Sequence, residues 1–65
     1  MQVKLNGQMI HTESKNITQL LEEFSITKQS IAVAVNLDVL KQELWDSYPL
    51  KENDSIECLT FMGGG

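Results

Sequence analysis

The chain opens with a regular alternation of hydrophobic and polar positions. From Met1 to Leu5 every odd-numbered residue is apolar and every even-numbered residue is polar, which is the pattern of a strand with one buried face. The pair Asn6-Gly7 then indicates a two-residue hairpin turn, because both residues tolerate a positive φ. We therefore expect a second strand, over about Gln8 to Thr12, that returns beside the first.

The next hydrophobic positions follow a helical period. Between Asn16 and Phe24 the apolar residues lie at i, i+3, i+4 and i+7. This single stripe consists of Ile17, Leu20, Leu21 and Phe24. Asn16 is suited to the N-cap position, and Gln19, three residues later, can complete a capping box. The pattern predicts one helix that turns this stripe toward a core.

The middle of the chain changes to a short run that is apolar at every position. Ile31 to Val35 predicts a central strand covered on both faces. Because only one helix is predicted, the second face must be covered by a loop or left partly exposed over its alanines. A short edge segment near Leu40 and a brief helical turn over Glu43 to Ser47 follow. Pro49 excludes a central strand or a helix interior at that point.

The last predicted strand runs from Ser55 to Phe61, after a turn over Lys51 to Asp54. Its alternation shifts along the way, because Ile56 and Cys58 lie on one face whereas Leu59 and Phe61 lie on the other. The pattern therefore predicts either a bulge or a strand end that exposes apolar side chains.

The order of these elements predicts an α+β domain of the ubiquitin-like, or β-grasp, class, with a mixed sheet packed on one main helix. In that arrangement the first and last strands pair in parallel at the centre of the sheet. We expect residues 1–62 to form this domain and the glycines of 63–65 to form a flexible C-terminal tail.

Composition and charge narrow the classes of function. The chain has 65 residues, a net charge of -4, five lysines and no arginine. Because nucleic-acid binding depends on cations that neutralise phosphates, we expect no nucleic-acid partner and favour a basic protein surface instead. One cysteine allows no internal disulfide, and no apolar run is long enough to span a membrane. These features predict a cytoplasmic protein with no membrane partner, monomeric when free.

The sequence ends on three glycines, Gly63, Gly64 and Gly65. They have no side chains to add to a core, and they lose the most backbone entropy on ordering. Extended, three residues reach roughly 10 Å and can enter a slot too narrow for any other residue. At the tip the α-carboxylate of Gly65 is ionised at neutral pH and is a poor electrophile. Adenylation by ATP would activate it, and since the chain has no phosphate-binding loop, a partner would have to bind the ATP.

The whole chain resembles the ThiS family of sulfur carriers in thiamine biosynthesis. The resemblance covers nearly all 65 residues without an evident insertion. It rests on Met1-Gln2-Val3-Lys4-Leu5-Asn6-Gly7, Leu20-Leu21-Glu22, Ala32-Val33-Ala34-Val35-Asn36, Leu40, Trp45, Asp54-Ser55-Ile56 and Gly64-Gly65. The chain departs from the family pattern at Lys41, where a proline is frequent, and at Asn53, where a glycine is frequent and where asparagine is the next best residue at positive φ.

The resemblance implies a β-grasp fold and a carrier that is not itself an enzyme. It implies that Gly65 is adenylated by a ThiF-type enzyme, which uses ATP and Mg²⁺, and is converted to a thiocarboxylate with sulfur from a donor protein. The thiocarboxylate then gives its sulfur to a ThiG-type thiazole synthase. Gly64 and Gly65 are the residues that carry over, with Gly63 as an extra glycine in the tail. No cofactor or metal is expected on this chain.

Four alternatives remain open from the sequence. One is a ubiquitin-related modifier on the same fold, which would be conjugated to lysines. A MoaD-like carrier for molybdopterin synthesis would use the same chemistry, although it tends to have a proline before its diglycine, which Leu59 to Met62 lacks. A ubiquitin-like interaction domain would have an inert tail, and the glycines would then be a disordered end or a cloning remnant. An enzyme would use Cys58 as nucleophile with His11 as base, but no third orienting group is evident, and Cys58 is more simply a small buried hydrophobe.

The surface beside the tail supplies the candidate docking residues Leu59, Phe61, Met62 and Glu57. Apolar residues there would seat the carrier on a partner, unless Leu59 and Phe61 simply close the core. Trp45 is expected to pack within the domain or along its edge. The acidic residues are expected to form a solvated surface; they are Glu22, Glu23, Asp38, Glu43, Asp46, Glu52, Asp54 and Glu57.

Overall fold

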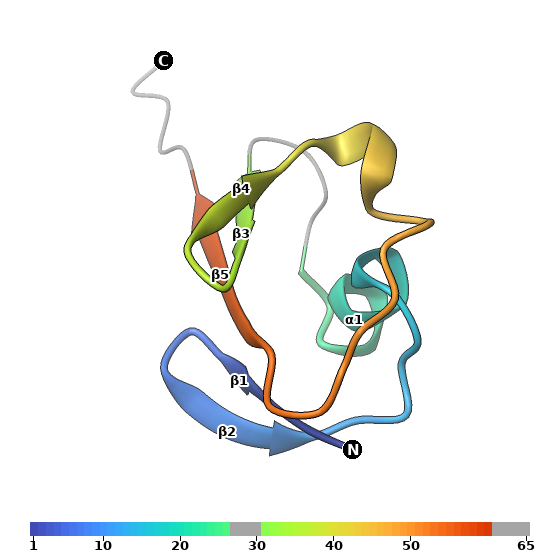
Figure 1. The fold of residues 1–65 in the computed structure, drawn as a ribbon, viewed down its shortest axis with the longest axis vertical. Helices are drawn as coiled ribbons and strands as arrows, with labels where there is room; N and C mark the ends of the chain where they lie inside the picture. The colour runs from blue at the N-terminus through green and yellow to red at the C-terminus, as the bar shows by residue number, and fades with distance from the viewer. Residues whose placement is uncertain (27–30, 61–65) are drawn as a thin grey trace.

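The computed structural model describes residues 1–26 and 31–60 of the chain, except for the side chain of Thr60. These residues form five strands, one α-helix and one short 3-10 helix, drawn in Figure 1. In chain order they are β1 (Gln2–Leu5), β2 (Gln8–His11), α1 (Ile17–Glu23), β3 (Ile31–Val35), β4 (Asp38–Leu40), η1 (Gln42–Leu44) and β5 (Ser55–Thr60).

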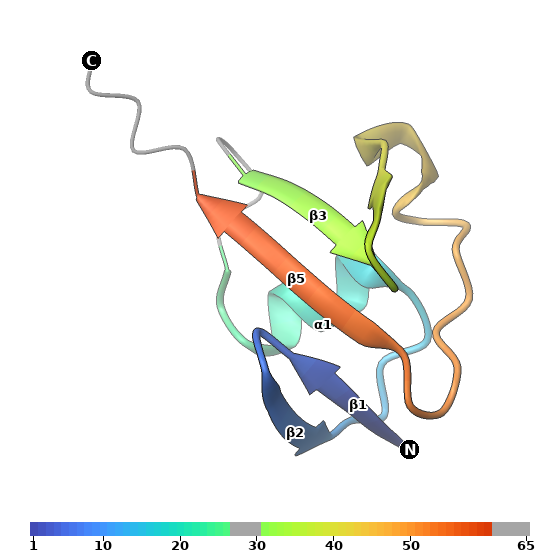
Figure 2. The same ribbon diagram turned by 60° about the vertical axis from the view of Figure 1, so that its left-hand side comes forward.

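The strands form one mixed sheet in the order β2-β1-β5-β3-β4. β1 and β5 pair in parallel, with Lys4 opposite Ser55, whereas β3 runs antiparallel to β5. The last strand therefore occupies the middle of the sheet (Figure 2). The predicted β-grasp class and the parallel pairing of the first and last strands are both confirmed.

Two hairpins use residues in the left-handed backbone region. The turn between β1 and β2 has Asn6 at φ 51° and Gly7 at φ 83°, which confirms the predicted two-residue turn. The turn between β3 and β4 repeats this geometry with Asn36 at φ 52° and Leu37 at φ 76°, and the sequence analysis did not anticipate it. Asn53 has φ 70°, as its position in the turn before β5 suggested.

Helix α1 begins with the cap that the sequence predicted. The Asn16 Oδ1 atom accepts a hydrogen bond from the Gln19 amide at 2.8 Å. The Gln19 side chain reaches back one residue further than in a standard capping box, because its Oε1 accepts from the Lys15 amide at 2.8 Å. The helix ends with Ser25 at φ 58°, where the Ser25 and Ile26 amides donate to the carbonyls of Glu22 and Leu21, as in a Schellman motif.

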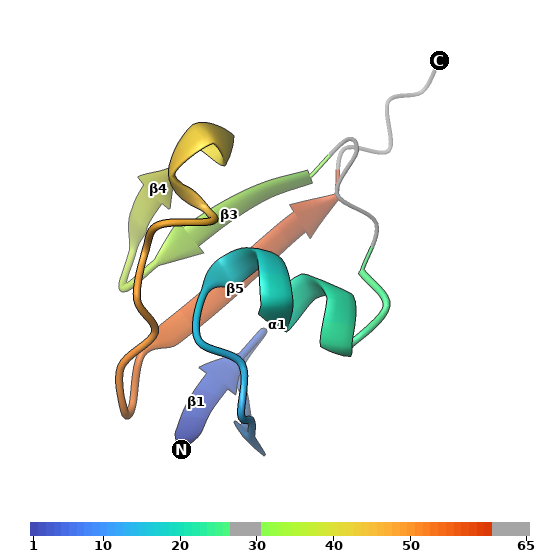
Figure 3. The same ribbon diagram turned by 90° about the vertical axis from the view of Figure 1, so that its right-hand side faces the viewer.

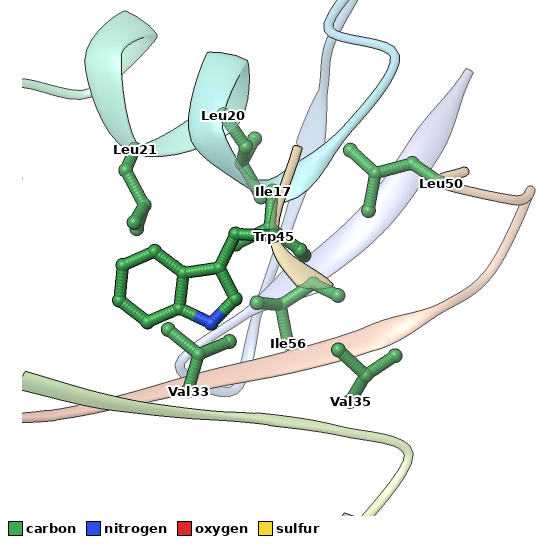
Figure 4. Packing of buried hydrophobic residues seen from close by; sticks show 8 residues of the cluster. All are labelled: Ile17, Leu20, Leu21, Val33, Val35, Trp45, Leu50 and Ile56. Carbon is green, nitrogen blue, oxygen red and sulfur yellow. The ribbon is translucent and has the colours of Figure 1, made fainter. Parts of the chain in front are cut away.

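The helix covers one face of the sheet, and the core lies between them (Figure 3). Figure 4 shows Trp45 from the segment after η1 among side chains of α1, β3 and β5. Its side chain is 2% exposed, and its Nε1 donates to the Leu40 carbonyl at 2.9 Å. Trp45 is therefore a packing residue. The buried core cluster consists of Ile17, Leu20, Leu21, Val33, Val35, Trp45, Leu50 and Ile56.

Two expectations about individual side chains were wrong. Phe24 was placed in the buried stripe of the helix, but it is the C-cap residue and is 38% exposed. Asp54 was assigned to the solvated surface but is 6% exposed, since its carboxylate accepts hydrogen bonds from the Asn36 side chain and the Lys51 amide.

Candidate functional site

The predicted reactive group lies beyond the end of β5. Gly63, Gly64 and Gly65, together with the docking candidates Phe61 and Met62, fall outside the residues that the structure describes. The site can therefore be built from the strand that leads into them. Ser55–Thr60 is a single strand of six residues, and Thr60 directly precedes the C-terminal residues in the sequence.

β5 has different neighbours on its two sides. On one side, its pairing with β3 continues to the last described residue, where Thr60 lies opposite Ile31. On the other side, its pairing with β1 stops at Ile56, because β1 ends at Leu5 and turns into the first hairpin. Residues 57–60 of β5, four of its six residues, are thus paired with a strand on one side only.

Two asparagine side chains hold the backbone of β5 in addition to these strands. The Asn6 Oδ1 atom accepts from the Cys58 amide at 2.8 Å, and the Asn36 Oδ1 atom accepts from the Ser55 amide at 2.9 Å. Both asparagines lie in hairpin turns with positive φ, so the turn geometry and the side-chain contact are supplied by the same residue. One hairpin therefore contacts the beginning of β5 and the other contacts a point near its end.

The side chains of β5 alternate between the core and the face of the sheet opposite α1. Ile56 is buried, whereas Glu57 and Leu59 are exposed, Leu59 at 59%. The register is continuous from Ile56 to Thr60, so these residues contain no bulge. The predicted alternative of an exposed apolar strand end is confirmed for Leu59, and the alternative in which Leu59 closes the core was wrong.

A small apolar surface surrounds Leu59. Its cross-strand partner is Ala32, and Ala34 lies between Glu57 of β5 and Val39 of β4 in the sheet. Val39 is 74% exposed. We call this surface, made of Ala32, Ala34, Val39, Glu57 and Leu59, the open face. Because the alanine side chains are short, the side chains of Leu59 and Val39 project further from the sheet than those of Ala32 and Ala34.

Cys58 lies on the other face of β5, half-buried against the core cluster. Burial raises the pKa of its thiol, which lowers the fraction of reactive thiolate at neutral pH. His11, the proposed base, is exposed on β2 and lies 3.4 Å from the Glu13 carboxylate. Among the described residues, no base is therefore placed on Cys58, and this geometry does not favour a thiol enzyme.

The part of the chain that the structure describes contains no cluster of three or more His, Cys, Asp or Glu side chains that could hold a metal ion. Within residues 1–26 and 31–60 no pocket is found either. No helix in these ranges is long and apolar enough to cross a membrane.

The sequence analysis missed two groups of residues at this site. The side-chain contacts of Asn6 and Asn36 with β5 were not foreseen, although both residues belong to the segments that carry the family resemblance. Val39 was not recognised as part of the exposed surface. A signal for Val39 was present, since Leu40 was expected to begin an edge segment and a strand residue next to it must turn the opposite way.

Comparison with known proteins gives consistent relatives over the whole chain. The ThiS family model matches residues 2–65. The sulfur carrier protein ThiS of Thermus thermophilus is 30% identical over 63 residues, with 97% of this chain and 98% of that protein covered. An uncharacterized protein, ycf40, of Trieres chinensis is 29% identical over 62 residues, with 94% of this chain and 85% of that protein covered.

Solved structures agree with these relatives. The crystal structure of a thiamine biosynthesis protein, ThiS, of Geobacter metallireducens superposes with a TM-score of 0.85 and 32% sequence identity, and covers 100% of both chains. A solution structure of a thiamine biosynthesis protein from the same organism gives a TM-score of 0.78 and covers 88% of that chain. The mixed sheet, the single helix, the sequence pattern and these full-length matches agree, and the chain belongs to the ThiS family.

Proposed function

We propose that this protein is a sulfur carrier of thiamine biosynthesis and that the Gly65 carboxylate is the group that carries the sulfur. The protein acts as a co-substrate of partner enzymes rather than as a catalyst. A ThiF-type enzyme activates Gly65, a donor protein supplies the sulfur, and a ThiG-type thiazole synthase receives it.

The chemistry has two steps at Gly65. A carboxylate oxygen attacks the α-phosphorus of ATP held with Mg²⁺ by the activating enzyme, and pyrophosphate leaves. The acyl-adenylate then has AMP as a good leaving group. A hydrosulfide equivalent from the donor attacks the Gly65 carbonyl carbon, the bond from this carbon to the bridging oxygen breaks, and AMP leaves with that oxygen. The product is a thiocarboxylate, whose sulfur is a nucleophile for the thiazole-forming step.

The observation that carries the proposal is the family match that runs through residue 65. The matched range contains Gly63, Gly64 and Gly65, and the Thermus thermophilus relative carries the name of a sulfur carrier. The fold supports the proposal as well, because β5, the central strand of the sheet, leads directly to the C-terminal residues.

The open face supports a docking role next to the tail. Leu59 is the exposed apolar residue of β5 that is nearest to Gly65 in sequence, and Glu57 lies on the same face of the strand. We propose that the activating enzyme covers Leu59 with apolar side chains and meets Glu57 with a basic one, with Phe61 and Met62 completing the contact. A carrier with a net charge of -4 and no arginine suits a basic partner surface.

Deletion of Gly65 tests the assignment of the reactive group. The variant should fold with the same free energy of unfolding as the wild type, because a terminal glycine contributes no side chain to the core. It should fail to support ATP–pyrophosphate exchange by the activating enzyme, since its new terminal carboxylate is one residue short of the reaction centre. Exchange at the wild-type rate would contradict the proposal, and loss of folding would contradict our interpretation of the glycines.

A further inference from the structure

The pairing of β5 leaves a gap on the side of β1. The last residue pair between these strands joins Leu5 and Ile56, after which the chain turns away through Asn6 and Gly7. The Asn6 amide still donates to the Ile56 carbonyl at 2.8 Å. The next amide of β5 that faces this side belongs to Cys58, and β1 has no further residue to accept from it.

The Asn6 side chain fills this gap. Its Oδ1 atom accepts from the Cys58 amide at 2.8 Å, so backbone and side chain of one residue contact two successive positions of β5. The left-handed φ of 51° is what allows both contacts, because it turns the chain into the hairpin while the side chain stays alongside β5. Asn6 thus acts as a one-residue extension of β1.

Asn36 makes the same kind of contact at the opposite end of the strand. It has nearly the same φ, 52°, and its Oδ1 atom accepts from the Ser55 amide at 2.9 Å. It also donates to the Asp54 carboxylate at 3.0 Å. Removing the Asn36 side chain therefore breaks more hydrogen bonds than removing that of Asn6, but it breaks them at the first residue of β5, far from the C-terminus in sequence.

We propose that Asn6 is a positioning residue for the reaction at Gly65. Its side chain fixes the direction in which β5 runs past the end of β1, and β5 leads in sequence to Gly65. This inference rests on the proposed function, since it assigns Asn6 a role in presenting the group that is activated.

The expected effect is on recognition rather than on the chemical step. If the end of β5 samples more directions, a smaller fraction of carriers is ready to enter the partner, and the apparent affinity falls by that fraction. Once the tail is bound, the reacting atoms are the same. Loss of the Asn6 contact should therefore raise KM for the carrier and leave kcat unchanged.

Three variants separate this role from a general loss of stability. Asn6→Gly keeps the positive φ and removes the side-chain oxygen that accepts from the Cys58 amide. Asn6→Asp keeps the positive φ and a side-chain oxygen acceptor. Asn36→Gly is the matched control at the other end of the strand. We expect Asn6→Gly to raise KM for the activating enzyme by up to about fivefold, the upper limit set by the loss of one hydrogen bond of ordinary strength. Asn6→Asp should restore the wild-type KM, and Asn36→Gly should leave KM unchanged although it is the less stable protein.

Amide hydrogen exchange provides a readout that does not depend on activity. Asn6→Gly should accelerate exchange at Cys58 about fivefold while Ile56 keeps its protection. Unchanged exchange at Cys58, or equal KM values for Asn6→Gly and Asn36→Gly, would overturn the inference while the proposed function stands. Wild-type carrier that is not activated at all would instead refute the proposed function, and this inference with it.

Discussion

Glu23, in the last turn of α1, connects the helix to the segment that follows the first hairpin. Its carboxylate accepts hydrogen bonds from the hydroxyl groups of Thr12 and Ser14, the latter at 2.7 Å. The Thr12 side chain is buried, and its hydroxyl oxygen also accepts from the Ser14 amide at 2.9 Å. The hydrogen bond from Thr12, followed by that from Ser14, lowers the pKa of Glu23 below its ordinary value.

This lowered pKa predicts an acid-dependent part of stability. The folded state favours the ionised carboxylate, so the contribution is complete above the ordinary pKa of an unfolded glutamate and is lost as pH falls through the lowered folded value. Glu23→Gln should be less stable than the wild type at neutral pH, and the difference should shrink on acidification. Denaturant unfolding at a series of pH values measures both.

A control keeps the change of net charge apart from the hydrogen bonds. Glu43→Gln removes one exposed carboxylate from η1 and is the matched substitution. A difference between wild type and Glu23→Gln that stays constant from neutral to acid pH would contradict the assignment.

For individual residues, the sequence predicted the backbone conformation better than it predicted the partners of side chains. Asn6, Gly7 and Asn53 have the positive φ expected of them, because that preference depends on the residue itself. The acceptor roles of Asn6 and Asn36 depend on which distant backbone amides come close, and the burial of Asp54 depends on its contact with the distant Asn36 side chain. These contacts join residues that are far apart in the sequence, so the local sequence does not predict them.

β5 is the element on which the proposed function depends. Its core face is fixed by Ile56 and Cys58, whereas Leu59 faces away from α1 and contributes little to the core. A side chain that is 59% exposed has lost little contact with water on folding, so its removal should cost little stability. A substitution at Leu59 can therefore test docking to a partner without a large change in the free energy of unfolding.

Leu59→Ala should therefore weaken docking without weakening the fold. We expect KM of the activating enzyme for the carrier to rise about tenfold, the effect of losing a modest apolar anchor at an interface. The melting temperature should stay close to that of the wild type. Steady-state kinetics with varied carrier concentration provides the measurement.

Leu37→Ala is the matched control for that experiment. Leu37 is also an exposed leucine, but it lies in the turn between β3 and β4, where the preceding residue, Asn36, contacts the beginning of β5 rather than its end. Equal increases in KM for both variants would show that docking does not depend on the position of Leu59. No change for Leu59→Ala would remove it from the docking surface.

The elements themselves were predictable because each has a local signal. The apolar stripe of α1 has a helical period, and the alternation of the first hairpin has the period of a strand. Asn16 marks the beginning of the helix as its N-cap residue. The 3-10 helix, Gln42–Leu44, and the tight turn at Leu37 were harder, because leucine at a positive φ contradicts its own preference. Such a conformation is imposed by the pairing of β3 with β4.

The molecule as a whole is built around one small hydrophobic core. The 56 residues described in 1–26 and 31–60 place all of their buried apolar side chains except Val3 in one small core cluster that includes Trp45. A domain of this size has few residues to spare for an enclosed site. Under the proposed function none is needed, since ATP, Mg²⁺ and the sulfur donor are all bound by partners.

The central claim is that sulfur is added at Gly65. The most direct test is intact mass spectrometry of the full chain after incubation with its activating enzyme, ATP and a sulfur donor. We predict an ATP-dependent replacement of one oxygen by one sulfur, located on the last residue by fragmentation. Fragmentation is essential because oxidation of Met1, Met9, Met62 or Cys58 adds nearly the same mass. An unchanged Gly65, with an enzyme that activates another carrier under the same conditions, would contradict the account.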